Sequence, residues 1–204
     1  KLADIYNISR EEQDEFAILS HERAAAARDA GRFAEEIVGV SVKTRKGEVV
    51  IDRDEHIKEG STMESLLKLR PAFKKNGTVT AANASGINDG AASVVVASEA
   101  YVKEQSLKPI AKIVSWGVAG VDPTIMGIGP VPAIKQALQK ADLTLADMDL
   151  VEVNEAFAAQ YLAVEKELDL DRSKTNVNGG AIALGHPVGA SGTRVVINAA
   201  YELR

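Results

Sequence analysis

The sequence predicts an α/β fold in which strands of a sheet are covered by helices. Apolar runs of strand length alternate with amphipathic stretches of helical period, which is the pattern of layered α/β proteins. Helix caps, glycines and prolines separate these runs and mark where each element ends. With 204 residues, of which 46% are hydrophobic, the chain can bury one large core or two small ones.

The N-terminal part is predicted to form a long helix, a hairpin and a short helix. Ser9 and Glu12 have the spacing of a capping box, and apolar residues follow at helical intervals. β-rich runs at 37–42 and 48–51 flank a polar connection, which indicates a β-hairpin. The region after it is rich in loops, with one short helix expected around 63–69, and such regions often cover a substrate.

Strands and helices are predicted to alternate through the rest of the chain. The apolar runs 91–97 and 110–121 indicate strands, the first of them fully buried. The remaining elements are a short strand at 149–153 and four helices, which run from Ser98 to about Gln105, from near Pro130 to Ala141, from about Asn154 to Leu168, and from near Ser191 onward.

Composition limits the class of function. The net charge of −5 argues against a nucleic-acid partner, because such proteins usually carry a basic face that neutralises phosphate. No apolar run approaches the roughly 20 residues that span a bilayer, so we expect no membrane partner. The chain has no cysteine, which excludes disulfides and thiolate metal sites within it. His21 and His56 lie in polar stretches and are predicted to be surface residues.

Residues 176–192 form the strongest functional signal in the chain. They contain five of the 16 glycines and one of the three histidines, His186. A glycine-rich backbone can approach a ligand closely, and an imidazole there can exchange protons near neutral pH. The glycine spacing imitates a phosphate-binding loop, but His186 and Pro187 replace the required Lys and Ser/Thr. The segment is therefore predicted to be an active-site loop and not a nucleotidase loop.

Three separate motifs resemble the thiolase family and occur in that family's order. They are Asn-Ala-Ser-Gly-Ile-Asn-Asp-Gly at 83–90, Val-Asn-Glu-Ala-Phe-Ala at 153–158 and Gly-His-Pro at 185–187. The resemblance extends from end to end and is closest to short-chain bacterial acetyl-CoA acetyltransferases. It implies a thiolase-like layered α/β/α fold that is incomplete in this chain.

The resemblance also implies a division into domains. Residues 1–88 match the latter part of the family's loop domain, which acts as a lid. Residues 89–109 match the returning segment of its N-terminal domain, and 110–204 match its C-terminal domain without the last strands. We therefore expect a fragment whose partners include the missing parts of the same protein. Because family members form dimers or tetramers, we also expect a homo-oligomer, in the cytoplasm.

The activity that the resemblance implies is a Claisen condensation of two acetyl-CoA molecules to acetoacetyl-CoA and CoA, or the reverse thiolysis. Thiolases use two cysteines, so the nucleophilic one is expected before Lys1 and the acid/base one after Arg204. This chain alone is predicted to be inactive, because its hydroxyl groups accept and release an acyl group far less readily than a thiolate does. No metal or redox cofactor is implied, since coenzyme A is substrate and product.

The resemblance assigns roles to individual residues. His186 matches the histidine that helps to deprotonate the nucleophilic cysteine and donates to the thioester oxygen. Asn154 matches the asparagine that fixes a water in the oxyanion site, and its place before a predicted helix also suits an N-cap. The positions that contact acyl-CoA in the family correspond to Ser85, Lys58, Ser65, Phe73, Ala81, Met126, Ala156 and Phe157.

Two alternatives to the short-chain enzyme stay open. The first is a longer-chain 3-ketoacyl-CoA thiolase of β-oxidation, although Met126 lies where short-chain enzymes narrow the acyl pocket, which favours acetoacetyl-CoA. The second is a non-catalytic CoA-binding module that has lost its cysteines.

Lys58 stands where relatives often use arginine beside the nucleotide phosphates. A lysine there keeps the positive charge but loses the planar fork of donors that arginine has.

Overall fold

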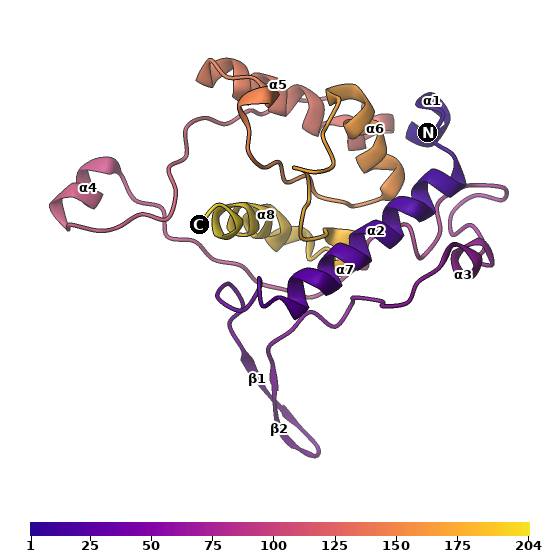
Figure 1. The fold of residues 1–204 in the computed structure, drawn as a ribbon, viewed down its shortest axis with the longest axis horizontal. Helices are drawn as coiled ribbons and strands as arrows, with labels where there is room; N and C mark the ends of the chain where they lie inside the picture. The colour runs from indigo at the N-terminus through magenta and orange to yellow at the C-terminus, as the bar shows by residue number, and fades with distance from the viewer.

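The computed structural model describes residues 1–204, and its longest helix is α2, which spans Arg10–Asp29. The predicted capping box is present: Ser9 Oγ accepts a hydrogen bond from Glu12 N at 3.0 Å, and Glu12 Oε2 accepts one from Ser9 N at 2.6 Å. The helix runs diagonally in Figure 1, next to α6 and α7. Its buried face carries apolar and small residues, among them Phe16, Ala17, Ser20, Ala24 and Ala27.

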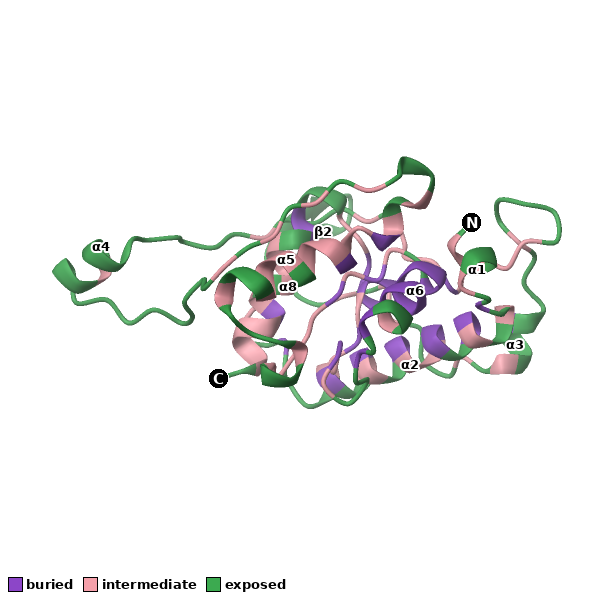
Figure 2. Cartoon of the chain, turned by 90° about the horizontal axis from the view of Figure 1, so that it is seen from above, coloured by how far each residue is buried: buried purple, intermediate pink, exposed green.

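The main core forms where α2 packs against α6 (Ala158–Leu168). The rings of Phe16 and Tyr161 stack with their centroids 4.1 Å apart, which adds a specific contact to the burial of two large side chains. Figure 2 shows that buried residues gather on α6 and on one side of α2. The elements that complete this core are α1 (Leu2–Ile5), the 3-10 helix η1 (Pro123–Ile128) and α5 (Pro130–Ala141).

A second, smaller core joins the C-terminal half of α2 to α7 (Ala181–Leu184). It consists of Ala24, Ala27, Phe33, Ala183 and Leu184. Just before α7 the backbone passes very close to α2 at Gly179, where φ is +77° and an added Cβ would lie 2.5 Å from Ser20 O. The glycine-rich segment is therefore held directly on α2, and α8 (Val188–Glu202) continues the chain from it.

The predicted hairpin consists of β1 (Val40–Thr44) and β2 (Gly47–Ile51), which pair antiparallel from Val40↔Ile51 to Thr44↔Gly47. Its connection is shorter than predicted, and Thr44 Oγ1 accepts a hydrogen bond from Lys46 N at 3.1 Å within it. All residues of both strands are exposed, and the hairpin projects from the helical part in Figure 1. The remaining short helices are α3 (Met63–Leu67), α4 (Glu99–Glu104) and η2 (Leu145–Asp147).

The two predicted strands at 91–97 and 110–121 form no ladder in this chain. Both segments are without helix or strand pairing, and the hairpin is the one sheet of the structure. Val95 is 96% exposed and Trp116 is 70% exposed, so the prediction of a buried strand at 91–97 was wrong for this chain. The physical reason is that a strand needs a neighbour for its N–H and C=O groups, and no other segment of the chain supplies one.

The helix predicted from about Asn154 is α6, and it begins later in the structure, at Ala158. The chain stays extended through Phe157, which has φ −146° and ψ 142° and forms an isolated bridge with Ala84. Asn154 is therefore not an N-cap, and that prediction was wrong because a tertiary pairing holds the backbone out of the helical region.

The last helix and the strand at 149–153 also differ from the prediction. α8 begins before Ser191, because its N-cap Pro187 fixes φ at −70° next to the first helical residue. The short strand is reduced to one parallel bridge between Val151 and Thr175. None of the helices combines the length and the hydropathy that crossing a bilayer requires.

Candidate active site

His186 and Asn154 lie side by side, although they are far apart in the sequence. Asn154 Nδ2 is 3.4 Å from His186 Nε2. The loop after α7 turns through Gly185, which has φ +91° and leaves no room for a Cβ, because that atom would lie 2.5 Å from Asn88 Oδ1. The backbone N–H of His186 lies near Gly86 O at 3.2 Å and near Asn88 Oδ1 at 3.3 Å, and both can accept from it. The three predicted motifs therefore meet at His186, where Asn154 contacts the ring and the 83–90 segment contacts the backbone N–H.

The other ring nitrogen of His186 faces Ser191, which lies in the first turn of α8. Ser191 Oγ is 2.6 Å from His186 Nδ1 and also donates to Pro187 O at 3.0 Å. Sequence patterns alone did not identify Ser191 as functional. The available signal was its position at the start of the helix that follows the histidine, where a side chain can fold back on the loop.

Glu155 connects the loop of His186 to α2 from inside the core. Its carboxylate accepts hydrogen bonds from Ser20 Oγ at 2.6 Å, from Asn176 Nδ2 at 2.9 Å and from Ile182 N at 3.2 Å. Burial raises the pKa of Glu155, while the hydrogen bonds from Ser20, Asn176 and Ile182 act in the opposite direction. With two oxygens facing three donors, this carboxylate organises the site and is too enclosed to reach a substrate.

Asn176 fixes the segment that carries Asn154. Its Oδ1 accepts from Val153 N and its Nδ2 donates to Val153 O, both at 2.8 Å. Gly180 is needed next to this pair, because a Cβ there would lie 2.2 Å from Glu155 Cδ. Buried contacts of Asn176 and Glu155 thus fix the backbone next to Asn154 and the backbone of α7, which leads to His186.

The loop with Ser85 pairs with the segment before α6. Both the backbone N and the Oγ of Ser85 donate to Ala156 O at 3.0 Å, and Ala158 N donates to Asn83 O at 2.9 Å. The hydroxyl proton of Ser85 is therefore in use within the chain. Its oxygen keeps lone pairs that can accept a hydrogen bond from a ligand amide.

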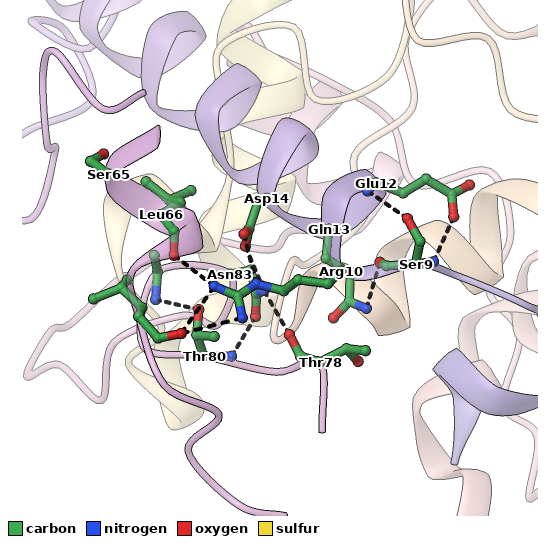
Figure 3. A network of polar contacts seen from close by, with 12 residues as sticks. Ser9, Arg10, Glu12, Gln13, Asp14, Ser65, Leu66, Thr78, Thr80 and Asn83 are labelled. Atoms are coloured by element: carbon green, nitrogen blue, oxygen red, sulfur yellow. Dashed lines mark hydrogen bonds and ion pairs between the residues drawn. The ribbon is translucent and has the colours of Figure 1, made fainter. Parts of the chain in front are cut away.

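A buried polar network holds the same loop on α2 (Figure 3). Asp14 accepts from Arg10 Nε at 2.6 Å and from Asn83 Nδ2 at 2.8 Å, and Asn83 Oδ1 accepts from Thr80 N at 2.8 Å. Asp14, Asn83 and Thr80 have no exposed surface. Arg10 also donates to Leu66 O at 2.6 Å, so the C-terminal end of α3 joins the network. The loop that carries Ser85 is consequently rigid at its base.

Some of the other predicted acyl-CoA contacts come together and some do not. Phe73 and Phe157 meet edge to face with centroids 6.2 Å apart, and Phe157 directly follows Ala156, whose carbonyl accepts from Ser85. Met126 lies on η1 and is 76% exposed. The hydroxyl of Ser65 serves the cap of α3 by donating to Thr62 O at 2.7 Å. The remaining two, Ala81 and Lys58, are exposed, and the Lys58 ammonium has no ion-pair partner in the chain.

The prediction that His21 lies at the surface was wrong. This side chain is 6% exposed on the buried face of α2, where Nδ1 accepts a hydrogen bond from Lys58 N at 3.1 Å. Burial, followed by the nearby charges of His56 and Lys58, lowers the pKa of His21 to about 4. His56 is half-buried against Gly86, where an added Cβ would lie 2.7 Å from His56 Cε1.

The chain matches two family models, described as "Thiolase, N-terminal domain" over residues 1–100 and "Thiolase, C-terminal domain" over residues 107–204. Among curated relatives, the acetyl-CoA acetyltransferase of Rhizobium meliloti (strain 1021) is 58% identical over 199 residues, which cover 98% of this chain and 51% of that protein. The mitochondrial 3-ketoacyl-CoA thiolase of Homo sapiens is 60% identical over 203 residues, which cover 100% of this chain and 51% of that protein.

Solved structures agree with these relatives. Human mitochondrial 3-ketoacyl-CoA thiolase superposes with a TM-score of 0.97 at 60% identity, over 100% of this chain and 51% of that one. The Bacillus anthracis acetyl-CoA acetyltransferase also superposes with a TM-score of 0.97, at 55% identity, over 99% of this chain and 51% of that one. This chain spans about half the length of the relatives it matches, and the predicted thiolase-like fold is confirmed over that half. Both the sequence motifs and the backbone lead to one conclusion: the chain belongs to the thiolase family.

Proposed function

We propose that the full-length protein carrying this chain is an acetyl-CoA C-acetyltransferase, which joins two acetyl-CoA molecules to acetoacetyl-CoA and CoA or catalyses the reverse thiolysis. The observation that carries the proposal is the 3.4 Å contact between Asn154 Nδ2 and His186 Nε2, which brings polar groups of two motifs to one point. A relative named acetyl-CoA acetyltransferase, 58% identical to this chain, supports the same reaction.

In the proposed first half-reaction, a cysteine from outside this chain attacks the thioester carbonyl of acetyl-CoA. Its thiol proton moves to His186 Nε2, the new S–C bond forms, and the bond from the carbonyl carbon to CoA breaks. A second cysteine, also from outside the chain, gives its proton to the departing CoA sulfur. The products of this step are an acetylated cysteine and free CoA.

In the proposed second half-reaction, the second cysteine, now a thiolate, removes an α-proton from another acetyl-CoA. The enolate oxygen faces the Nε2–H of His186 and a water held by Asn154, and one such donor is worth about 3 kcal/mol of barrier. The enolate carbon then attacks the acetylated cysteine, so a C–C bond forms and the S–C bond breaks. The proton on His186 returns to the sulfur, and no metal or redox cofactor takes part.

The proposed acyl-CoA path runs past Ser85, Ala156 and Phe157 to Phe73. Support comes from the pairing of Ser85 with Ala156 and from the edge-to-face contact of Phe73 with Phe157, which together line up four of the proposed contacts. The remaining proposed contacts are Lys58, Ser65, Ala81 and Met126. Lys58 is an exposed cation without an ion-pair partner and suits a phosphate, whereas Ser65 would have to share a hydroxyl that already caps α3.

A longer-chain 3-ketoacyl-CoA thiolase is the second candidate function. A specific finding favours it, namely the human relative of that name, which is 60% identical to this chain. Met126 favours the short-chain enzyme, because a methionine at that position narrows the space for the acyl chain. A CoA-binding module without turnover is the third candidate, and it has no observation of its own in support.

We also propose that other parts of the same protein, and further copies of it, complete the molecule. Support comes from the exposed apolar segments around Val95 and Trp116, whose backbones lack sheet partners here. The proposed compartment is the cytoplasm, although several relatives are named as mitochondrial. Subcellular fractionation of the source organism distinguishes the two compartments, and light scattering on the purified protein gives the number of copies.

The test is thiolysis by the full-length protein with acetoacetyl-CoA and with longer 3-ketoacyl-CoA substrates. We expect the highest kcat/KM for acetoacetyl-CoA. Replacing His186 by Ala, or Asn154 by Ala, should lower kcat at least about 100-fold with little change in the thermal midpoint. The control is Asp142→Gly, which changes an exposed residue with φ +57° at the C-cap of α5, outside the three motifs and the proposed acyl-CoA contacts.

The other outcomes decide between the candidates. A profile with its maximum at longer acyl chains would replace the short-chain assignment by the second candidate. Saturable acyl-CoA binding without any turnover would support the binding module. Near-normal turnover in both variants would remove His186 and Asn154 from the mechanism.

A further inference from the structure

Ser191 holds the imidazole of His186 from the side opposite Asn154. Its side chain is buried, with the residue 6% exposed, and it extends from the first turn of α8 back to the loop. The Oγ lies 2.6 Å from His186 Nδ1 and 3.0 Å from Pro187 O. On the other side of the ring, Nε2 lies 3.4 Å from Asn154 Nδ2. These three contacts together determine where the proton of a neutral ring resides.

A serine hydroxyl has one proton to donate, and a carbonyl oxygen can only accept. If Ser191 donates to Pro187 O, then its oxygen accepts from His186 Nδ1–H, and the bare Nε2 accepts from Asn154. All three contacts are then paired correctly. If Ser191 instead donates to Nδ1, its oxygen faces the Pro187 carbonyl oxygen without a proton between them, and Nε2–H points at the amide N–H groups of Asn154. Two of the three contacts are then repulsive.

We infer that Ser191 is a positioning residue that keeps neutral His186 in the Nδ1–H form, so that Nε2, on the side of Asn154, is the ring nitrogen that can accept a proton. The inference rests on the proposed function, in which Nε2 accepts the proton of a cysteine thiol. When Nε2 takes that proton, the bond from Nδ1–H to Ser191 is unchanged. The ring therefore accepts and returns a proton without turning, which keeps it aligned in both half-reactions.

The local fold explains why a serine can do this. Ser191 N donates to Pro187 O at 2.9 Å as part of the first helical turn, so its side chain is brought back over the proline that follows His186. Gly189 and Gly192 have open space where a Cβ would be, so the neighbouring positions of the same turn do not enforce this arrangement. The hydroxyl of Ser191 is thus the group that sets the ring, and its removal leaves Nδ1 without a fixed acceptor.

The experiment uses histidine-labelled full-length protein and long-range ¹H–¹⁵N correlation spectra, with the His186 signals assigned from the loss of signal in His186→Asn. In the wild type we expect a protonated Nδ1 and a bare Nε2. In Ser191→Ala we expect a mixture of both forms and a kcat about tenfold lower, the loss that corresponds to one neutral hydrogen bond, with KM for acyl-CoA unchanged. Ser191→Thr keeps the hydroxyl and should restore both the Nδ1–H form of His186 and the wild-type kcat.

The control is Ser20→Ala, which removes another buried serine hydroxyl but does not touch the imidazole. It should lower the thermal midpoint and leave the His186 signals as in the wild type. If Ser191→Ala keeps the Nδ1–H form with kcat within about twofold of the wild type, the inference is overturned. If wild-type protein has the expected ring form but no thiolase turnover, the proposed function fails and the assignment of the ring proton stands.

Discussion

Ser20 and Glu155 are joined by a 2.6 Å hydrogen bond, although 135 positions separate them in the sequence. The same Ser20 hydroxyl oxygen accepts from Gly180 N at 3.1 Å, so one side chain of α2 contacts two of the motifs around His186. Because these groups are buried, the loss of any one of them leaves polar atoms without partners. Substitutions along this set of contacts should therefore change stability and activity in distinct ways.

Replacing Glu155 by Ala should destabilise the full-length protein by about 3 kcal/mol or more, because three buried donors lose their acceptor. Glu155→Gln keeps one carbonyl oxygen and should cost less, since only the donor that faces the new NH₂ group is unpaired. Thermal unfolding at a fixed scan rate measures both variants. Equal stability of Glu155→Ala and the wild type would contradict the organising role of this carboxylate.

Replacing Gly180 by Ala should lower both the yield of folded protein and the thermal midpoint. The new Cβ would lie 2.2 Å from Glu155 Cδ, and the buried carboxylate has no space to move into. Gly189→Ala is the matched control on the adjacent helix, because nothing lies within 4 Å of its added Cβ. The stability ranking of these two variants checks the geometry, and a harmless Gly180→Ala would show that the loop can move away from Glu155.

Replacing Asp14 by Ala should destabilise the protein by about 3 kcal/mol, since it leaves Arg10 and the buried Asn83 without their partner. Because Asn83 holds the loop that carries Ser85, KM for acyl-CoA should rise more than kcat falls. The control on the same helix is Glu15→Ala, an exposed position where a change within about 0.5 kcal/mol is expected. Steady-state kinetics and thermal unfolding test both variants. An unchanged KM in Asp14→Ala would show that the Asp14 network does not position the loop that carries Ser85.

Buried His21 should make the folded protein less stable on acidification, in a window set by its lowered pKa, whereas the raised pKa values of Glu36 and Glu152 act in the opposite direction. Its pKa is about 4 in the folded protein and 6.5 as the ordinary value, so below pH 6.5 the unfolded chain binds a proton that the folded chain does not. The contribution of neutral His21 is therefore complete above pH 6.5 and is lost as the pH falls from 6.5 towards 4. Its size is on the order of 2 kcal/mol.

His21→Asn keeps an acceptor near the position of Nδ1 and cannot be protonated in this range. On going from about pH 7 to about pH 5, the thermal midpoint of His21→Asn should therefore rise relative to that of the wild type. Parallel pH dependences in the two proteins would mean that His21 does not contribute to the pH dependence of stability. The comparison needs only unfolding curves at the two pH values.

Elements fixed by short-range sequence signals were predictable, and those that depend on distant partners were not. The capping box of Ser9 and Glu12, the β1–β2 hairpin and the proline-led α5 use residues close together in the chain. The apolar run 91–97 has the sequence of a strand, but strand pairing requires a second segment. Its residues therefore indicate a preference for extended backbone, whereas its exposure depends on whether a partner strand is present.

The candidate site shows the same division. His186 and Asn154 were predicted from motifs, and the structure brings them within 3.4 Å. The roles of Ser191 and Asn176 were missed, because the contact of Ser191 depends on how the loop turns between His186 and α8, and the contacts of Asn176 are made to Val153 and Glu155, more than 20 positions away. His21 was misplaced because its polar neighbours in sequence suggested a surface, whereas helical spacing places it on the same buried face as Ala17 and Ala24.

Successive turns of α2 each hold a different part of the site. Asp14 holds the loop of Ser85, Ser20 holds Glu155, and Arg23 donates to Thr175 O and Arg172 O at 2.7 Å each. A single inserted or deleted residue in this helix would rotate everything beyond it by about 100° and shift it by about 1.5 Å. The spacing between these three side chains is therefore constrained as a unit, so that α2 tolerates substitution on its outer face but not a change of length.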